Sequence, residues 1–379
     1  MKNNKTDFIQ GNIACVEGAI VAGCKFFAGY PITPASEIAE HMSERMFQVN
    51  GTFIQTEDEL SSIAAVVGSS WAGAKAMTAT SGPGISLMQE NIGLAIATET
   101  PLVIVDVQRG GPSTGSPSIS LQGDTIQVKY GSQGEYQVIS IAPSSPQEMF
   151  DYTIWAFNIA EKFRTPVFVM ADVMVGHMRE QVEYPEDYNE LEIFDRKILD
   201  DPDSTEGRFL STEVAPMPIF GNGFKANVTG STHDEFGWRN VSDPKVMDNF
   251  IKKLTNKILN NKSEIIRTEK EYMEDAEVVL LSYGSVSRAA LETVHTAREK
   301  EIKVGSYRLV TVWPFPEKEI SKMSENVEKI IVLENNLGQI YPYVRSAVDG
   351  KAEVELLSPS VLGEFFEPNY ILNKIKEAK

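Results

Sequence analysis

The feature that most constrains the fold is an alternation of short apolar runs and longer amphipathic segments across residues 11–179. Residues 102–107, LVIVDV, form an almost continuously apolar run, which is typical of a strand buried on both faces of a parallel sheet. Similar strands are predicted at residues 26–30, 53–55, 76–80, 138–141 and 166–170. Because helical patterns separate most of these strands, the sequence predicts an α/β domain with a doubly wound parallel sheet.

A second, smaller α/β unit is predicted from Ala276 onward. Its strands are expected at residues 278–285, 304–312, 330–334 and 354–357. The length of 379 residues is enough for two or three domains that each bury a core of their own.

The segment between these units has a different composition. Residues 180–243 carry 15 acidic and 5 basic side chains and are rich in Pro, Asn and Gly, so we expect a long irregular connection draped over a neighbouring surface. The charged and periodic residues 245–272 predict a single helix. The domain organisation predicted from these patterns is residues 1–180, residues 181–272 and residues 273–379.

The overall composition excludes several classes of protein. Asp plus Glu total 53 against 35 Lys plus Arg, a net charge of −18, which argues against a nucleic-acid-binding surface. Cys15 and Cys24 are the two cysteines of the chain, too few for an iron–sulfur cluster with about four thiolate ligands or for a cysteine-based zinc site. We therefore expect no metal site in this chain and a reducing, cytoplasmic location. The sequence also shows neither a signal-peptide pattern nor an apolar run of about 18 residues, so no membrane association is expected.

The four histidines do not form a ligand pattern. No pair of them has the spacing that would place two imidazoles on one face of a helix. His233 lies in an unusual polar string, TGSTHDE, within the acidic connection. This string is either a functional site or a loop that is held together by Asx and Ser/Thr turns.

Polar side chains follow three of the predicted strands at the point where each strand ends. Thr33 follows the first strand, an acidic triplet at residues 57–59 follows the second, and Arg109 follows the long apolar strand. Because the carboxyl ends of parallel strands share one edge of a sheet, these groups are expected to converge on a ligand. Arg provides a bidentate fork for a carboxylate, and Thr can donate to a second oxygen.

Each of these groups also has a purely structural interpretation. Thr33 lies between two prolines and can cap a helix, and Arg109 can pair with a surface acid. The acidic triplet can be a solvated first turn that the helix dipole favours. Gly82 and Gly84 follow a strand and open a helix, either as an anion site at a helix N-terminus or as a tight turn.

Five motifs occur together, in the order found in the 2-oxoacid:ferredoxin oxidoreductases. They are YPITP at 30–34, EDE at 57–59, SGPGISLM at 81–88, RGGPSTG at 109–115 and LENNLGQ at 333–339. The chain resembles the α subunit of the 2-oxoglutarate branch of this family from about residue 11 to its C-terminus. The resemblance also covers APMP at 215–218 and THDE at 232–235.

The resemblance implies both a fold and a set of cofactors. It implies a thiamine-diphosphate-binding domain of the pyrimidine type, followed by a smaller α/β domain like the C-terminal domain of transketolase. This chain would hold the pyrimidine end of thiamine diphosphate. The diphosphate with its Mg²⁺ and the iron–sulfur cluster would belong to partner chains, and CoA would be a co-substrate. The implied partners are a β subunit and ferredoxin or ferredoxin-like subunits, in an (αβ)₂ or larger assembly.

The resemblance also implies roles for residues near the cofactor. Glu59 matches the catalytic glutamate that hydrogen-bonds the pyrimidine ring, with Glu57 as the alternative. The expected neighbours of the cofactor are Tyr30, Pro31, Gly82 and Gly84. A buried site is expected to raise the pKa of Glu59 by desolvation.

The substrate residues follow from the same motifs. Thr33 and Arg109 are expected to bind the carboxylate and carbonyl of a 2-oxoacid and so to act in catalysis. Ser118 is the expected second substrate contact, at a position where the family often has Thr.

The implied reaction is the CoA-dependent oxidative decarboxylation of 2-oxoglutarate to succinyl-CoA, reversible, with electrons passed to ferredoxin. The segment GPSTG at 111–115 resembles the 2-oxoglutarate type. The alternatives are an enzyme for branched-chain 2-oxoacids or pyruvate, and a scaffold or regulatory subunit without catalysis. The presence of Thr33, Glu59 and Arg109 argues against the scaffold.

Overall fold

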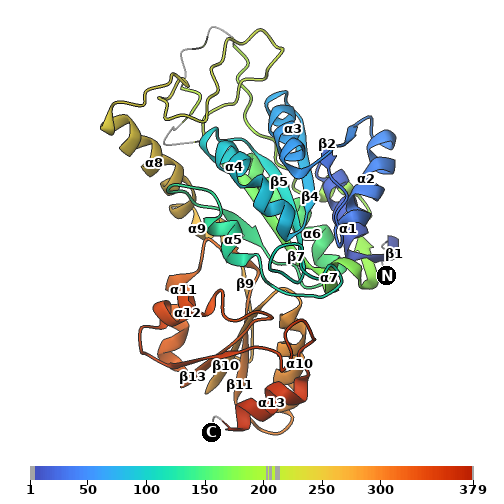
Figure 1. Cartoon of the computed structure of the whole chain (residues 1–379). Coiled ribbons are helices and arrows are strands. Elements are labelled where there is room, and N and C mark those ends of the chain that lie inside the picture. Colours follow the sequence, from blue (N-terminus) through green and yellow to red (C-terminus); the bar gives the residue numbers. More distant parts are fainter. Residues whose placement is uncertain (1–4, 202–203, 205–206, 210–213, 378–379) are drawn as a thin grey trace.

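The computed structural model describes residues 5–201, 204, 207–209 and 214–377. Two α/β units follow one another along the chain, the larger N-terminal unit and the smaller C-terminal unit (Figure 1). One apolar core runs without a break from the sheet of the first unit, at Ile104, to the sheet of the second, at Val279. The two units therefore pack as one body.

The N-terminal unit is built on a seven-stranded sheet in the order β12-β6-β7-β5-β4-β2-β3. All its strands are parallel except β12, which is antiparallel to β6. The strands are β2 (Cys24–Gly29), β3 (Thr52–Gln55), β4 (Lys75–Thr80), β5 (Leu102–Gln108), β6 (Ile139–Ile141), β7 (Pro166–Asp172) and β12 (Thr311–Trp313). Strand β5 is buried along its whole length between β4 and β7, which confirms the parallel, doubly wound arrangement predicted from its apolar run.

Helices cover both faces of this sheet. One face carries α3 (Glu59–Trp71) and α4 (Gly82–Ala97), and the other carries α1 (Gly11–Val21), α2 (Ser36–Gln48) and α6 (Pro146–Phe163). The short helices α5 (Thr125–Tyr130) and α7 (Val173–His177) lie toward the C-terminal unit in Figure 1. Outside the main sheet, β1 (Lys5–Gln10) pairs antiparallel with β8 (Arg179–Tyr184).

The C-terminal unit is a five-stranded sheet in the order β14-β13-β10-β11-β9, with helices on both faces. Its strands are β9 (Thr268–Glu271), β10 (Val278–Tyr283), β11 (Val304–Leu309), β13 (Lys329–Leu333) and β14 (Glu353–Leu357). Its helices are α10 (Val286–Arg298), α11 (Glu317–Met323), α12 (Tyr341–Val348) and α13 (Pro368–Glu377), with a 3₁₀ turn at Ser324–Asn326. Strand β9 is antiparallel to β11, whereas the other strands are parallel.

The single helix predicted for residues 245–272 is wrong beyond Leu259. Helix α8 (Pro244–Leu259) ends at two asparagines, and the amide of Asn261 donates to the Lys257 carbonyl at 2.8 Å, which satisfies one of the last carbonyls of the helix. A four-residue helix, α9 (Lys262–Ile265), and the edge strand β9 follow. Because β9 belongs to the second sheet, we propose that the C-terminal unit begins at Thr268 and not at residue 273.

The single strand predicted for residues 304–312 is also divided. Strand β11 stays in the second sheet, whereas β12 crosses to the first sheet and pairs with β6. Trp313 at the end of β12 is buried, and its indole N–H donates to the Thr125 carbonyl at 2.9 Å. A local apolar pattern predicts a strand but does not predict which sheet the strand joins.

The acidic connection is irregular, as predicted, and buried groups anchor it. Arg196 forms a buried ion pair with Glu161 of α6 at 2.6 Å and donates to the Ser70 carbonyl at 3.0 Å. Phe209 and Phe220 pack against Trp71 at the end of α3. Figure 1 shows the later part of this segment, before α8, at the end of the N-terminal unit that lies away from the C-terminal unit, whereas its start in β8 pairs with β1. The 3₁₀ turn Tyr188–Glu190 lies near its start.

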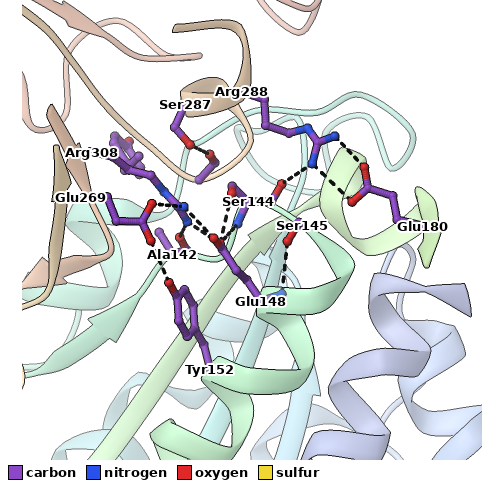
Figure 2. Close-up of polar contacts among 12 residues, drawn as sticks. Ala142, Ser144, Ser145, Glu148, Tyr152, Glu180, Glu269, Ser287, Arg288 and Arg308 are labelled. Atoms are coloured by element: carbon purple, nitrogen blue, oxygen red, sulfur yellow. Dashed lines mark hydrogen bonds and ion pairs between the residues drawn. The ribbon is translucent and has the colours of Figure 1, made fainter. Parts of the chain in front are cut away.

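A polar cluster joins the two units on the side of α6 (Figure 2). Arg308 of β11 is buried, forms ion pairs with Glu148 of α6 and Glu269 of β9, and donates to the Ala142 carbonyl at 3.2 Å. Arg288 of α10 reaches back in the same way to Glu180 at 2.6 Å. These cross-unit bonds fix the orientation of the C-terminal unit.

Candidate active site

The carboxyl ends of β2, β3, β4 and β5 bring the predicted site residues to one edge of the sheet. Thr33 follows β2, Glu59 begins α3 after β3, Gly82 and Gly84 begin α4 after β4, and Arg109 follows β5 directly. This convergence is the one predicted from the three strand ends. The edge faces the C-terminal unit, since Ser285 at the start of α10 donates to a carboxylate oxygen of Asp172 at the end of β7.

Carbonyl oxygens hold the guanidinium of Arg109. One terminal nitrogen donates to the Thr33 carbonyl at 2.6 Å and the other to the Thr114 carbonyl at 2.7 Å. The side chain is 8% exposed, and its Nε has no partner among the described residues. Carbonyl dipoles orient a guanidinium without neutralising it, so the positive charge of Arg109 stays available to an anion. The alternative of a pairing with a surface acid has no support in the described part of the chain.

Thr33 is held in place by the same contact. Arg109 binds its backbone carbonyl, and its side chain stays exposed at the sheet edge. The N-cap of α2 is Ala35, so Thr33 does not cap this helix. The hydroxyl of Thr33 is therefore free of a capping role.

The three adjacent acids have different environments. Glu57 is exposed, and Asp58 caps α3, since its carboxylate accepts the Ser61 N–H at 2.7 Å. Glu59 is 4% exposed. The pKa of Glu59 is raised, chiefly because burial disfavours the charged carboxylate. The nearby charge of Asp58 also raises this pKa, whereas the Glu59 backbone N–H and the charge of Arg109 lower it. Of the three, Glu59 is the carboxyl suited to hold a proton inside a protein site.

Gly84 makes room for this carboxyl. A Cβ at this position would lie 1.9 Å from the Thr80 hydroxyl oxygen and 2.7 Å from Oε1 of Glu59. Gly82 and Gly84 belong to the first turn of α4, whose N-cap is Ser81. The turn follows its strand directly, and the missing side chain at Gly84 leaves the space that Glu59 fills.

Replacing Gly84 with Ala is expected to displace Glu59 and to impair both folding and activity. The overlap with Thr80 and Glu59 should lower the free energy of unfolding by about 1–3 kcal/mol, and turnover should fall further because the carboxyl moves. Denaturant unfolding and turnover of the variant measure both effects. Gly68→Ala in α3 is the matched control, since nothing lies within 4 Å of its added Cβ. Wild-type activity of Gly84→Ala would contradict the placement of Glu59.

A cavity of about 420 Å³ opens beside Arg109. Its wall includes Gly82 and Ser86 of α4, Asp124 before α5 and Gln339 of the C-terminal unit. Both units therefore contribute to the site. The sequence interpretation missed Asp124 and Gln339, although Gln339 ends the LENNLGQ motif.

The remaining predicted residues lie around this edge. Tyr30 is 41% exposed and Pro31 is exposed after β2. Ser118 lies in an exposed loop that is closed by the bond from the Gly110 N–H to the Ile119 carbonyl at 2.9 Å, and it does not belong to the wall of the cavity. The roles of Tyr30, Pro31 and Ser118 stay predictions.

His233 is a core residue of the irregular connection. Its ring is fully buried and makes T-shaped contacts with the rings of Phe209 and Phe250, at centroid distances of 4.8 and 5.0 Å. Its Nδ1 lies 2.9 Å from the Ser231 carbonyl oxygen, and Asp234 next to it accepts two backbone N–H groups at 3.0 Å. Of the two interpretations of this string, the structure supports the loop held by Asx turns.

Comparison with known proteins identifies the family. Residues 17–253 match the family described as the thiamine-diphosphate-binding domain of pyruvate flavodoxin/ferredoxin oxidoreductases. The chain belongs to this family. Residues 276–363 match core domain II of pyruvate:ferredoxin oxidoreductase.

Relatives and a solved structure support the assignment over the whole chain. The 2-oxoglutarate synthase subunit KorA of Methanocaldococcus jannaschii is 52% identical and covers 96% of this chain and 97% of its own. The ketoisovalerate oxidoreductase subunit VorB of Methanothermobacter marburgensis is 37% identical, and the alignment covers 98% of this chain and 97% of the relative. The 2-oxoglutarate:ferredoxin oxidoreductase of Magnetococcus marinus, solved with 2-oxoglutarate, CoA and succinyl-CoA bound, has a TM-score of 0.92 at 32% identity. That alignment covers 100% of this chain and 66% of the other.

None of the helices in the described part of the chain has both the length and the apolar character that crossing a membrane requires. No three His, Cys, Asp or Glu side chains in the same part of the chain come together as a group suited to a metal ion.

Proposed function

We propose that this chain is the α subunit of a 2-oxoglutarate:ferredoxin oxidoreductase, active only with its partner subunits. In the reaction, 2-oxoglutarate, CoA and two oxidised ferredoxins give succinyl-CoA, CO₂, two reduced ferredoxins and a proton, reversibly. The observation that carries the proposal is the carbonyl-held Arg109 beside the buried Glu59, in a chain 52% identical to a 2-oxoglutarate synthase subunit.

The residues at the sheet edge fit the pyrimidine end of thiamine diphosphate. An aminopyrimidine needs a carboxyl that can share a proton with its ring nitrogen, and Glu59 is buried with a raised pKa. The missing side chain at Gly84 leaves room for that carboxyl. Tyr30, Pro31 and Gly82 are the proposed further contacts of the cofactor. When bound, thiamine diphosphate supplies the electron sink that allows a 2-oxoacid to lose CO₂.

The chain itself contributes substrate binding and proton control. Arg109 would hold the substrate carboxylate, because its guanidinium is oriented by the Thr33 and Thr114 carbonyls and forms no ion pair with an acid among the described residues. The Thr33 hydroxyl would donate to a second oxygen of the substrate. Ser118 is the proposed second substrate contact, because it lies in the exposed 110–119 loop that follows Arg109.

The redox chemistry is assigned to partner chains. Cys15 and Cys24 are buried free thiols, and burial raises the pKa of both to about 12, which suits structural cysteines. We therefore assign the iron–sulfur cluster and the diphosphate site with its Mg²⁺ to partner subunits. A β subunit and ferredoxin are the proposed partners, in an (αβ)₂ or larger assembly. Free thiols support a cytoplasmic location.

A substrate panel tests the proposal. The chain is purified with its partner subunits, and CoA-dependent reduction of a viologen dye is measured with 2-oxoglutarate, pyruvate and 2-oxoisovalerate. We expect the highest kcat/KM with 2-oxoglutarate. Equal or better rates with 2-oxoisovalerate would favour the branched-chain alternative. The 37% identity to a ketoisovalerate oxidoreductase subunit is the reason to include this substrate. No turnover with any of the three by a cofactor-loaded complex would favour a scaffold subunit.

A further inference from the structure

The loop of residues 110–124 carries one of the two carbonyls that orient Arg109. The Thr114 carbonyl accepts from the Arg109 guanidinium at 2.7 Å. Residues 111–119 of this loop are all exposed, whereas Ser120, which follows them, is buried. An exposed stretch has no core packing of its own, so its position depends on the bonds at its two ends.

Gly110 closes the exposed part of the loop beside the guanidinium. Its N–H donates to the Ile119 carbonyl at 2.9 Å, and its carbonyl accepts from the Ser116 N–H at 2.7 Å. Because Gly110 directly follows Arg109, the loop returns to the residue next to the guanidinium. Ile119 continues into residues 120–124. A displacement of residues 120–124 is therefore expected to move the carbonyl that orients Arg109.

Asn335 of the C-terminal unit holds residues 120–124 from the other side. It belongs to the LENNLGQ motif and is 5% exposed. Its side-chain N–H donates to the Ser120 carbonyl at 2.9 Å, and its backbone N–H and carbonyl both bond Gln122 at 3.0 Å. Its side-chain oxygen accepts the Gly363 N–H at 3.1 Å, which fixes the side chain within its own unit. Asn335 thus connects the loop to a rigid part of the C-terminal unit.

Two further residues of the motif bond the same segment. Asn336 donates through its side chain to the Gln122 carbonyl at 2.7 Å. The Gln339 side chain accepts the Ile126 N–H at 2.9 Å and donates to the Gly123 carbonyl. Gln339 also lines the cavity, whereas the two asparagines do not belong to its wall. An effect of the asparagines on a bound substrate must therefore pass through the loop.

We propose that Asn335 is a positioning residue of the substrate site and acts on Arg109 through the loop of residues 110–124. The C-terminal unit thereby sets the affinity of the site for an anionic 2-oxoacid. The Thr33 carbonyl, which also orients Arg109, is not part of this loop, so loss of the Asn335 side chain displaces the guanidinium only in part. The inference rests on the proposed function, because it assigns the cavity beside Arg109 to a 2-oxoacid.

The Michaelis parameters of the assembled complex test the proposal. Asn335→Ala removes the bond to the Ser120 carbonyl, so KM for 2-oxoglutarate should rise about 5- to 10-fold while kcat stays within about 2-fold of wild type. Lower stability alone would reduce the active fraction, and hence kcat, without changing KM. Gln122→Ala removes the side chain that bonds the Asn335 N–H at 3.0 Å and should give the same result. If Asn335→Ala fails to fold, Gln122→Ala carries the prediction.

Arg288→Ala is the matched control, because it also removes bonds between the two units. Arg288 donates to the Ser144 carbonyl at 3.4 Å and pairs with Glu180 at 2.6 Å, and none of these three residues lines the cavity (Figure 2). Arg288→Ala should keep the wild-type KM. A wild-type KM in both Asn335→Ala and Gln122→Ala, or an equal rise of KM in Arg288→Ala, would overturn the proposal.

Hydrogen exchange in the assembled complex separates this inference from the proposed function. Backbone N–H groups of the loop, such as those of Ser116 and Gln122, are bonded, so peptides that cover the loop report how firmly it is held without any turnover. We expect these peptides to exchange at least about 10-fold faster in Asn335→Ala than in the wild type, with no change in Arg288→Ala. Unchanged exchange in Asn335→Ala and Gln122→Ala would refute the proposal even in an active complex. Faster exchange in a cofactor-loaded complex that turns over no 2-oxoacid would refute the proposed function, and the substrate role with it, but not the hold of Asn335 on the loop.

Discussion

Replacing Glu59 with Gln is expected to lower 2-oxoglutarate-dependent dye reduction by the assembled complex at least about 100-fold. The amide keeps the size of the side chain and fits the space above Gly84, but it cannot exchange a proton with a cofactor nitrogen. The measurement is kcat in the viologen assay, with the bound thiamine diphosphate quantified in the same preparation. Loss of turnover with the cofactor retained indicates a catalytic role, whereas loss of the cofactor indicates a binding role.

Stability gives this prediction a control against misfolding. The pKa of Glu59 is raised in the folded chain, so its ionisation disfavours the native state as the pH rises above the ordinary pKa of a glutamate. The neutral Gln avoids this cost, and Glu59→Gln should be at least as stable as the wild type at neutral pH. Glu57→Gln, two residues away and exposed, is the matched variant and should keep wild-type turnover. Inactivity of Glu57→Gln with an active Glu59→Gln would reverse the assignment of the two acids.

Replacing Arg109 with Ala is expected to reduce kcat/KM for 2-oxoglutarate by about 100-fold or more, mostly through KM. The guanidinium is the positive charge of the cavity, and the bonds to the Thr33 and Thr114 carbonyls orient it for a carboxylate. Arg109→Lys keeps the charge but loses the planar fork, so its kcat/KM should lie between those of the wild type and Arg109→Ala. Initial rates over a range of 2-oxoglutarate concentrations separate KM from kcat.

A second arginine controls for the general effect of losing a positive charge. Arg345 is exposed near the end of α12 in the C-terminal unit and does not line the cavity. Arg345→Ala should therefore leave kcat/KM unchanged. An Arg109→Ala variant with wild-type KM would remove Arg109 from the substrate site and, with it, the reason to place the 2-oxoacid in this cavity.

The sequence predicted the parts of the site that depend on local pattern. Apolar runs separated by helical segments predict a parallel sheet, and in such a sheet the residues after each strand share one edge. Thr33, the acidic triplet at residues 57–59 and Arg109 are therefore placed at the sheet edge by their positions after the strands, as the structure shows. The sequence did not distinguish Glu59 from its two acidic neighbours on physical grounds; the family resemblance singled it out. In the fold, Glu57 is exposed, Asp58 caps α3 and Glu59 is buried, because consecutive residues at a helix start point in different directions.

The residues that the sequence interpretation missed depend on contacts between distant segments. Gln339 of the C-terminal unit bonds the backbone of Gly123 and Ile126, on both sides of Asp124, although it lies 215 positions further along the chain than Asp124. Strand β12 leaves its own sheet for the other one, and Thr268 to Glu271 pair as a strand where the charge pattern favours a helix. Local propensity does not encode such pairings, since they arise only when two surfaces meet.

The sequence by itself determined the α/β class and the sheet edge where the candidate site residues Thr33, Glu59 and Arg109 meet, because these follow from periodicity and from the order of the motifs. Tertiary structure alone decided the environment of each group. Burial raised the pKa of Glu59, two carbonyls oriented the guanidinium of Arg109, and the packing of the units placed Asp124 and Gln339 in the wall of one cavity. Desolvation and charge proximity depend on distances in space, and a sequence records only distances along the chain.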